Sequence, residues 1–69
     1  MQLSTRNQLN ATVESVQLGE VMALVKVTLP DGQKITAAIT REASTELELA
    51  AGDQVTVLVK ATEVMLAKE

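Results

Sequence analysis

Apolar and polar residues alternate along much of this chain, and this alternation constrains the fold more than any other feature. In residues 21–29 every odd-numbered position is apolar, whereas the even positions include Lys26 and Thr28. Successive side chains of a β-strand point to opposite faces of the sheet, so a repeat of two residues indicates a strand. The same repeat returns in residues 35–40 and 55–62. The chain is therefore predicted to be mostly β-sheet.

The segment of residues 21–29 also indicates what lies next to it in the fold. It is followed by Pro30-Asp31-Gly32, a strong turn signal, so it should form a hairpin with residues 35–40. Met22 and Leu24 add apolar side chains on the second face of this strand. Both faces of its first half are therefore expected to be covered.

An earlier and a later strand complete the predicted sheet. Residues 9–18 form the earlier strand, but the parity of their apolar positions changes near Glu14 and Ser15. A β-bulge adds one residue to a strand and would reconcile the two parities, so a bulge is predicted there. Val64 and Leu66 predict a short last strand.

One helix is predicted, over residues 41–49. Thr40 is a suitable N-cap because its hydroxyl can accept a hydrogen bond from a free backbone N–H. The order is three strands, the short helix and two further strands, so the fold class is all-β with one short helix. This order matches a five-stranded OB-type Greek-key barrel, with an SH3-like barrel as the nearest alternative.

Composition indicates a single domain, residues 1–69, that gains stability by association. A chain of 69 residues has a small core, and such folds usually add disulfides, a metal ion or oligomerisation. Cysteine and histidine are absent, which excludes disulfides and sites built from these ligands. Hydrophobic residues make up 46% of the chain without one aromatic side chain. A homo-oligomer is the remaining solution.

The residue inventory also excludes several functions. Without cysteine or histidine there is no nucleophile–base pair, and the acidic residues are scattered, so the chain is not expected to be an enzyme. A net charge of −3 and the lack of aromatic residues argue against nucleic acid as a partner. No apolar run approaches the about 20 residues that span a bilayer, so no membrane association is expected. The start of the chain lacks an apolar signal segment, which favours the cytoplasm.

Three polar segments stand out from the alternating pattern: residues 4–7, 40–44 and 60–62. Together they offer hydroxyls, a guanidinium, an ammonium and the N–H groups at the start of the predicted helix. Donors of this kind suit a small oxyanion. Each segment taken singly also fits an ordinary polar surface, so composition alone leaves the ligand open.

The same segments carry a family resemblance. Residues 1–9 read Met-Gln-Leu-Ser-Thr-Arg-Asn-Gln-Leu, which resembles the opening of the Mop proteins, or molbindins, where Ser-Ala-Arg-Asn-Gln-Leu follows Met and two further residues. Residues 35–40, residues 47–49 followed by Gly52, and residues 59–66 resemble the middle and the end of that family. The likeness covers essentially the whole chain, in order and without a large gap. The chain therefore resembles a single TOBE-type domain.

This resemblance implies a ligand and an assembly. The ligand would be molybdate, or tungstate of the same shape and charge, held as an intact oxyanion without direct bonds from side chains to the metal. The assembly would be a hexamer, a trimer of dimers, with the first strand reaching across to a partner and the oxyanion sites between subunits. The role would be molybdenum homeostasis or storage in the cytoplasm.

The resemblance also implies site residues. Ser4 would offer its hydroxyl or backbone N–H, and Arg6 would add charge or orient the first segment. Thr5 stands beside them in place of the family's usual Ala. Lys60 would be a direct cationic donor, and the N–H of Ala61 would add a contact.

A neighbouring subunit would contribute the remaining implied donors. These are Thr40 and the helix start, including Ala43 and Ser44. The family often has Ser-Ala where this chain has Ala43-Ser44, so the hydroxyl expected at Ala43 is missing. Its replacement would be Ser44, Thr45 or a backbone N–H.

Two other functions are compatible with the same sequence. The domain could be an oxyanion-sensing module that acts on a partner protein, or a structural β-barrel oligomer without a ligand. A sensor would associate with its partner in response to the oxyanion, whereas a structural oligomer would show no heat of binding.

Overall fold

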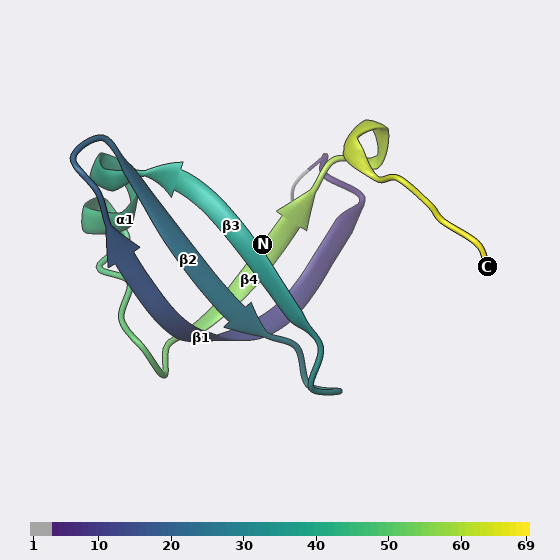
Figure 1. Ribbon diagram of the computed structural model, residues 1–69, viewed down its shortest axis with the longest axis horizontal. Coiled ribbons are helices and arrows are strands. Elements are labelled where there is room, and N and C mark those ends of the chain that lie inside the picture. The colour runs from purple at the N-terminus through teal and green to yellow at the C-terminus, as the bar shows by residue number, and fades with distance from the viewer. Residues whose placement is uncertain (1–3) are drawn as a thin grey trace.

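The computed structural model describes residues 4–69, and these form a curled antiparallel sheet with one short helix (Figure 1). The elements in chain order are β1 (Asn7–Leu18), β2 (Met22–Thr28), β3 (Lys34–Thr40), α1 (Arg41–Glu46), β4 (Gln54–Val59) and the 3-10 turn η1 (Ala61–Glu63). The predicted all-β class with one short helix is confirmed.

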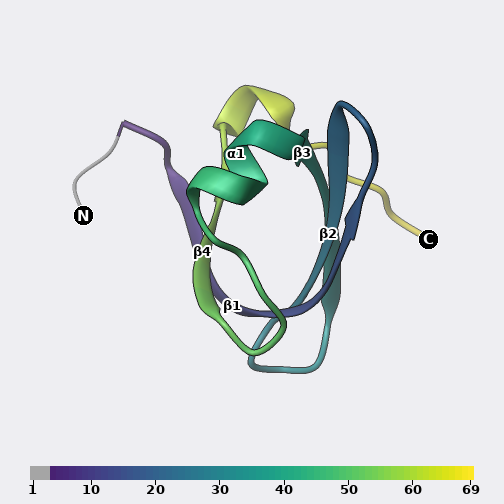
Figure 2. The same ribbon diagram turned by 90° about the vertical axis from the view of Figure 1, so that its left-hand side faces the viewer.

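The long strand β1 organises the sheet, whose strand order is β3-β2-β1-β4. Its first half pairs with β4 and its second half pairs with β2. The pairing with β2 shifts between Val13 and Ser15, which leaves Glu14 as the extra residue and confirms the predicted bulge. A bulge bends its strand. Figure 2 shows the result: β4 and the first half of β1 lie on one side of the molecule, β2 and β3 lie on the other, and β1 curls across between the two sides. Helix α1 lies across the near end.

The hairpin between β2 and β3 has the predicted turn. Gly32 has a φ of 92°, in the left-handed region that favours glycine, and its N–H donates to the Leu29 carbonyl at 2.9 Å. The Leu29 N–H donates to the Gln33 carbonyl at 2.7 Å. Hydrogen bonds from the side chain and backbone of Gln33 hold the pKa of the Asp31 carboxyl below its ordinary value. The turn residues therefore satisfy one another locally.

The expected fifth strand is not formed within the described chain. Strand β4 ends at Val59, and η1 then turns the chain away from the sheet (Figure 1). Val64 and Leu66 are 47% and 94% exposed and belong to no strand. Across residues 4–69 the outer edges of β3 and β4 are therefore unpaired, and the sheet has four strands rather than five.

The core lies inside the curl and consists of small aliphatic side chains. Ala11, Val13, Val25 and Val27 are each at most 3% exposed. The side chains packed around them come from β1, β3 and β4, from the residue after β2 and from the loop after α1. Strand β2 thus buries its odd-numbered side chains, as the alternation predicts. Its second face is different, because Met22 and Leu24 remain 46% and 37% exposed. One chain by itself does not cover both faces.

The predicted helix cap is confirmed, but the helix is shorter than predicted. The Thr40 Oγ1 accepts a hydrogen bond from the Ala43 N–H at 3.0 Å. The helix ends at Glu46 rather than Leu49 because Glu48 adopts a left-handed φ of 52°. This conformation reverses the chain and places Leu49 against the core.

Candidate functional site

The antiparallel pairing of β1 with β4 creates the candidate site. Asn7 pairs with Val59 at the end of this ladder, so the segment before β1 lies beside the segment after β4. The two segments line a surface pocket of about 430 Å³ that is open to solvent. Its lining residues are Ser4, Thr5, Arg6, Lys60, Ala61 and Thr62. The structure therefore brings together the site residues predicted at the start and at the end of the chain.

The pocket has the chemistry of an anion site. The lining side chains supply three hydroxyls, a guanidinium and an ammonium, and none of these residues carries a carboxylate. Arg6 and Lys60 are both exposed, so their charges are available to a ligand from solvent. Thr62 belongs to the polar segment recognised in the sequence but was not among the predicted site residues. Its position on η1 adds a hydroxyl to the pocket.

Two amide side chains at the start of β1 hold the pocket segments. The Asn7 Nδ2 donates to the Val59 carbonyl at 3.0 Å, and the Gln8 Nε2 donates to the Thr5 carbonyl at 3.0 Å. Both residues were missed as functional candidates. The sequence carried a signal for them, because Asn7 is the last residue of the polar segment 4–7 and Gln8 directly follows it.

The predicted donors around α1 lie elsewhere. Helix α1 is at the opposite end of the molecule from η1 (Figure 1). There the Thr40 hydroxyl already accepts from the Ala43 N–H, and Ser44 is only 3% exposed. Within one described chain these three residues therefore do not join the pocket of Lys60. Their predicted role concerns a neighbouring subunit, and it stays a prediction.

The surface pocket beside α1 is acidic. It has a volume of about 520 Å³. Its lining residues are Glu20, Val21, Thr40, Arg41, Glu42, Thr45 and Glu46. The Arg41 Nη1 donates to the Gly19 carbonyl at 2.9 Å, so part of its guanidinium is engaged. Three carboxylates around one arginine make this pocket a poor place for an anion.

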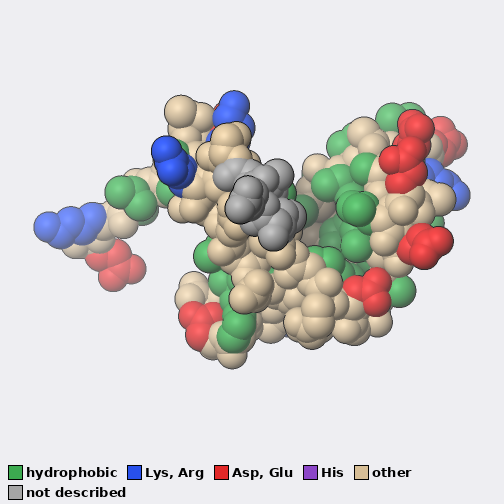
Figure 3. Space-filling model, turned by 180° about the vertical axis from the view of Figure 1, so that it is seen from behind, with side chains coloured by type: hydrophobic (Ala, Val, Ile, Leu, Met, Phe, Trp, Pro, Cys, Tyr) green, Lys and Arg blue, Asp and Glu red, His purple; other side chains and the backbone are tan. Residues whose placement is uncertain are grey.

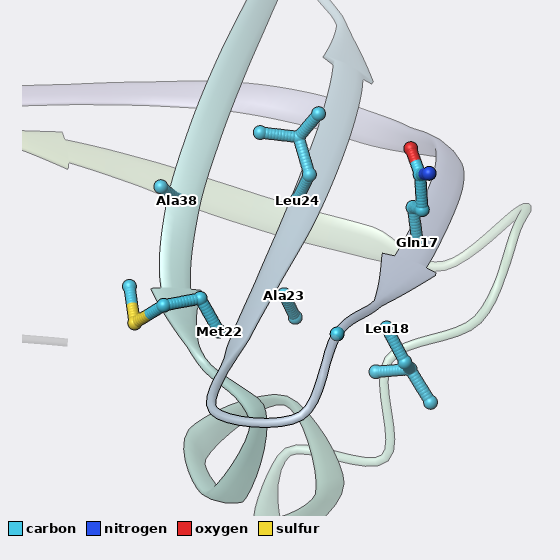
Figure 4. A pocket seen from close by; sticks show the side chains of 7 residues that line it. Gln17, Leu18, Met22, Ala23, Leu24 and Ala38 are labelled. Carbon is cyan, nitrogen blue, oxygen red and sulfur yellow. The ribbon is translucent and has the colours of Figure 1, made fainter.

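A third pocket, of about 320 Å³, is apolar and lies over the outer face of β2 (Figure 4). Leu18, Met22, Leu24 and Ala38 contribute carbon side chains, and Gln17 contributes an amide. This composition suits contact with another apolar surface rather than chemistry.

Two further features bear on function. Within residues 4–69 no group of three or more acidic residues is arranged to hold a metal ion. Over the same residues, α1 and η1 are too short and too polar to cross a membrane.

Comparison with known families agrees with the fold. The model of the TOBE domain family matches residues 3–66. A probable molybdenum-pterin-binding protein of Haemophilus influenzae is 35% identical over 69 residues, which cover all of both chains. MopA of Rhodobacter capsulatus, also a molybdenum-pterin-binding protein, is 49% identical over 67 residues.

Solved structures agree as well. A molybdate-binding protein from Sporomusa ovata is 44% identical, with a TM-score of 0.93 over 99% of this chain and 100% of that one. The cytoplasmic molybdate-binding protein ModG, solved with molybdate bound, is 38% identical, with a TM-score of 0.90 over 94% of this chain and 46% of that one. All these relatives are named as binding proteins.

The relatives differ in length. This chain spans 25% of MopA and 24% of the molybdenum transport protein ModE of Herbaspirillum seropedicae, but all of the Haemophilus influenzae protein. The matched unit is thus found both alone and as part of longer proteins. With its TOBE match over nearly the whole length and its full-length likeness to molybdenum-pterin-binding proteins, the chain belongs to the Mop, or molbindin, family of TOBE-type domains.

Proposed function

We propose that this chain binds molybdate as an intact oxyanion in the pocket between the start of β1 and the end of β4. The observation that carries the proposal is the meeting of Arg6 and Lys60 with three hydroxyls in a pocket whose lining residues have no carboxylate. Molybdate is a tetrahedral dianion, and charge-assisted hydrogen bonds from such donors are its best partners. Tungstate has the same shape and charge and would bind in the same way.

The charge of the rest of the surface favours binding of an anion at this pocket over other places on the molecule. The whole chain has a net charge of −3, so most of its surface repels anions. Arg6 and Lys60 make the pocket a local exception. The solved relative ModG, which has the same fold, was crystallised with molybdate bound.

We further propose that the protein serves molybdenum storage or homeostasis in the cytoplasm. A chain that binds an intact oxyanion without catalytic groups can take it up and release it unchanged. ModG, which is described as cytoplasmic, supports this location.

The working unit in this proposal is a homo-oligomer, with the hexamer implied by the family resemblance. Within residues 4–69, five small side chains form the buried apolar core, whereas ten large hydrophobic residues are exposed. Figure 3 shows hydrophobic side chains still visible beside the α1 end of the molecule, with acidic side chains around them. Such exposure is unusual for a monomer and is typical of an association surface.

Two more features support association between copies. The outer edges of β3 and β4 are unpaired within residues 4–69, and unpaired strand edges are templates for further strands. Met65 and Leu66 are 91% and 94% exposed on the segment that follows η1. In the proposed assembly a neighbouring α1 brings Thr40, Ala43 and Ser44 toward the pocket.

A second candidate function is an oxyanion-sensing module. The observation in its favour is that the matched unit forms about a quarter of MopA and of ModE, so it also occurs within longer proteins. A sensor would change its association with a partner protein when the oxyanion binds. Pull-down from cells grown with and without molybdate distinguishes the two roles.

The decisive experiment is isothermal titration with molybdate, with sulfate as the control anion. We expect saturable molybdate binding with a weaker response to sulfate. Lys60→Ala should lower the affinity about tenfold or more, since a charged hydrogen bond contributes about 1.5–3 kcal/mol. Lys68→Ala removes an exposed lysine outside the pocket and should leave the affinity unchanged. Equal effects of the two changes would contradict the proposed site. If the folded, oligomeric wild-type protein gives no heat of binding with molybdate, a structural role is favoured.

A further inference from the structure

We infer that Asn7 and Gln8 are positioning residues that set the geometry of the oxyanion pocket without touching the ligand. This inference rests on the proposed function, because it assigns a role within the same pocket. The two amides lie at the start of β1, between the pocket segment that precedes this strand and the strand β4 that leads to the other pocket segment.

Asn7 connects the two halves of the pocket. Its Nδ2 donates to the Val59 carbonyl at 3.0 Å, across 52 positions of sequence. Arg6 directly precedes Asn7, and Lys60 directly follows Val59, so this hydrogen bond lies at the last rung of the ladder, next to both cationic residues. Asn7 is half-buried, which shields the bond from water. Its loss would let the two pocket segments move apart.

Gln8 holds the pocket segment that precedes β1 through a local hydrogen bond. Its Nε2 donates to the Thr5 carbonyl at 3.0 Å, three residues earlier. This bond folds the segment of Ser4, Thr5 and Arg6 back toward the strand that follows it. Because the Gln8 bond is exposed, it should contribute less than the half-buried Asn7 bond.

Residue choice supports a specific role for Asn7. Asparagine is depleted in strands, where β-branched and aromatic residues are favoured, so its presence in β1 needs a local reason. The bond to Val59 supplies that reason. A neutral amide also suits the position better than a second lysine or a carboxylate, since it holds the segments without changing the charge of the pocket.

The test compares two variants that each remove a side-chain hydrogen bond between β1 and β4. Asn7→Ala removes the bond beside the pocket. Gln54→Ala removes the 3.0 Å bond from Gln54 Nε2 to Thr12 Oγ1, toward the other end of the same ladder. We expect Asn7→Ala to weaken molybdate binding about three- to tenfold and Gln54→Ala to leave it unchanged. Thermal melts followed by circular dichroism should show small losses of stability for both variants, with the larger loss for Asn7→Ala because its bond is half-buried and the Gln54 bond is exposed.

A double-mutant cycle separates positioning from a general loss of structure. If Asn7 acts by placing Lys60, the effect of Asn7→Ala on affinity should shrink to less than twofold in a Lys60→Ala background, because coupled residues are not additive. The salt dependence should also differ. Lys60→Ala removes a charge and should flatten the fall of affinity with ionic strength, whereas Asn7→Ala should leave that slope unchanged.

The possible outcomes are distinct. If the wild-type chain binds molybdate and Asn7→Ala binds it equally well, the positioning role is overturned while the proposed function stands. Full additivity with Lys60→Ala also overturns it. Failure of the folded wild-type oligomer to bind molybdate overturns the proposed function and this inference together.

Discussion

The two ends of the curled sheet differ in charge, although the same strand, β1, runs from one to the other. Where β1 begins, Arg6 and Lys60 line a pocket whose lining residues include no carboxylate. Where β1 finishes, Glu20, Glu42 and Glu46 surround Arg41 beside the helix. The second end nevertheless carries predicted donors, among them Thr40. The contrast teaches that the cationic residues of the pocket gather at one end of the sheet. In the proposed function, any contribution from the α1 end to that pocket therefore has to come from another copy.

The largest effect on molybdate affinity is expected from a substitution that prevents copies of the chain from associating. Leu66→Asp places a charge on an exposed apolar residue of the segment after η1, and burying an unpaired charge is costly. We expect the oligomer to dissociate and molybdate affinity to fall about tenfold or more, since the neighbour's donors are lost. Light scattering and isothermal titration measure the two effects. Ala51→Asp adds the same charge in the exposed turn before β4 and is the control. An intact oligomer with unchanged affinity would show that this segment lies outside the interface.

A smaller effect is expected at the helix cap, where the two ends would meet. Thr40→Ala removes the hydroxyl that accepts from the Ala43 N–H, which should lower the free energy of unfolding by about 1 kcal/mol. Because Thr40 is also a predicted donor to the neighbour's pocket, we expect affinity to fall about threefold to tenfold. Thr12→Ala, which removes a hydroxyl that accepts from the Gln54 Nε2 at 3.0 Å, is the control for affinity. A stability loss with unchanged affinity would mean that Thr40 only caps the helix.

The smallest effect on binding is expected at the end of the helix. Glu48 has a left-handed φ of 52°, a conformation that costs a non-glycine residue about 1 kcal/mol or more. Glu48→Gly should therefore raise the free energy of unfolding by about 1 kcal/mol in chemical denaturation, and leave molybdate affinity unchanged. Glu46→Gly, within α1, should instead destabilise the chain by about 1 kcal/mol. A changed affinity in Glu48→Gly would link the acidic end to the pocket directly.

Local features could be read from the sequence with good accuracy. The hairpin at Pro30-Asp31-Gly32, the bulge at Glu14 and the cap at Thr40 are all present. Each depends on residues that are close together in the chain or on a repeat of two. The length of the helix was predicted wrongly, because the left-handed conformation of Glu48 carries no signal in a residue type that usually continues a helix.

The candidate site was only partly accessible from the sequence. The polar segments at residues 4–7 and 60–62 could be recognised, and the family resemblance connected them. The amides of Asn7 and Gln8 were missed, because their role depends on which carbonyl each one reaches. Residue type alone does not specify such a partner.

The sequence by itself determined four of the five predicted strands, the hairpin turn, the bulge and the excess of aliphatic residues over what one small core can bury. These follow from alternation, turn chemistry and composition, which act over a few residues or over the whole inventory. Only the tertiary structure decided that the chain leaves the sheet after Val59, and that Arg6 and Lys60 line one pocket while Thr40 lies at the far end. The physical reason is that the pairing of Asn7 with Val59 joins segments 52 residues apart, and such a register is set by the packing of the whole sheet.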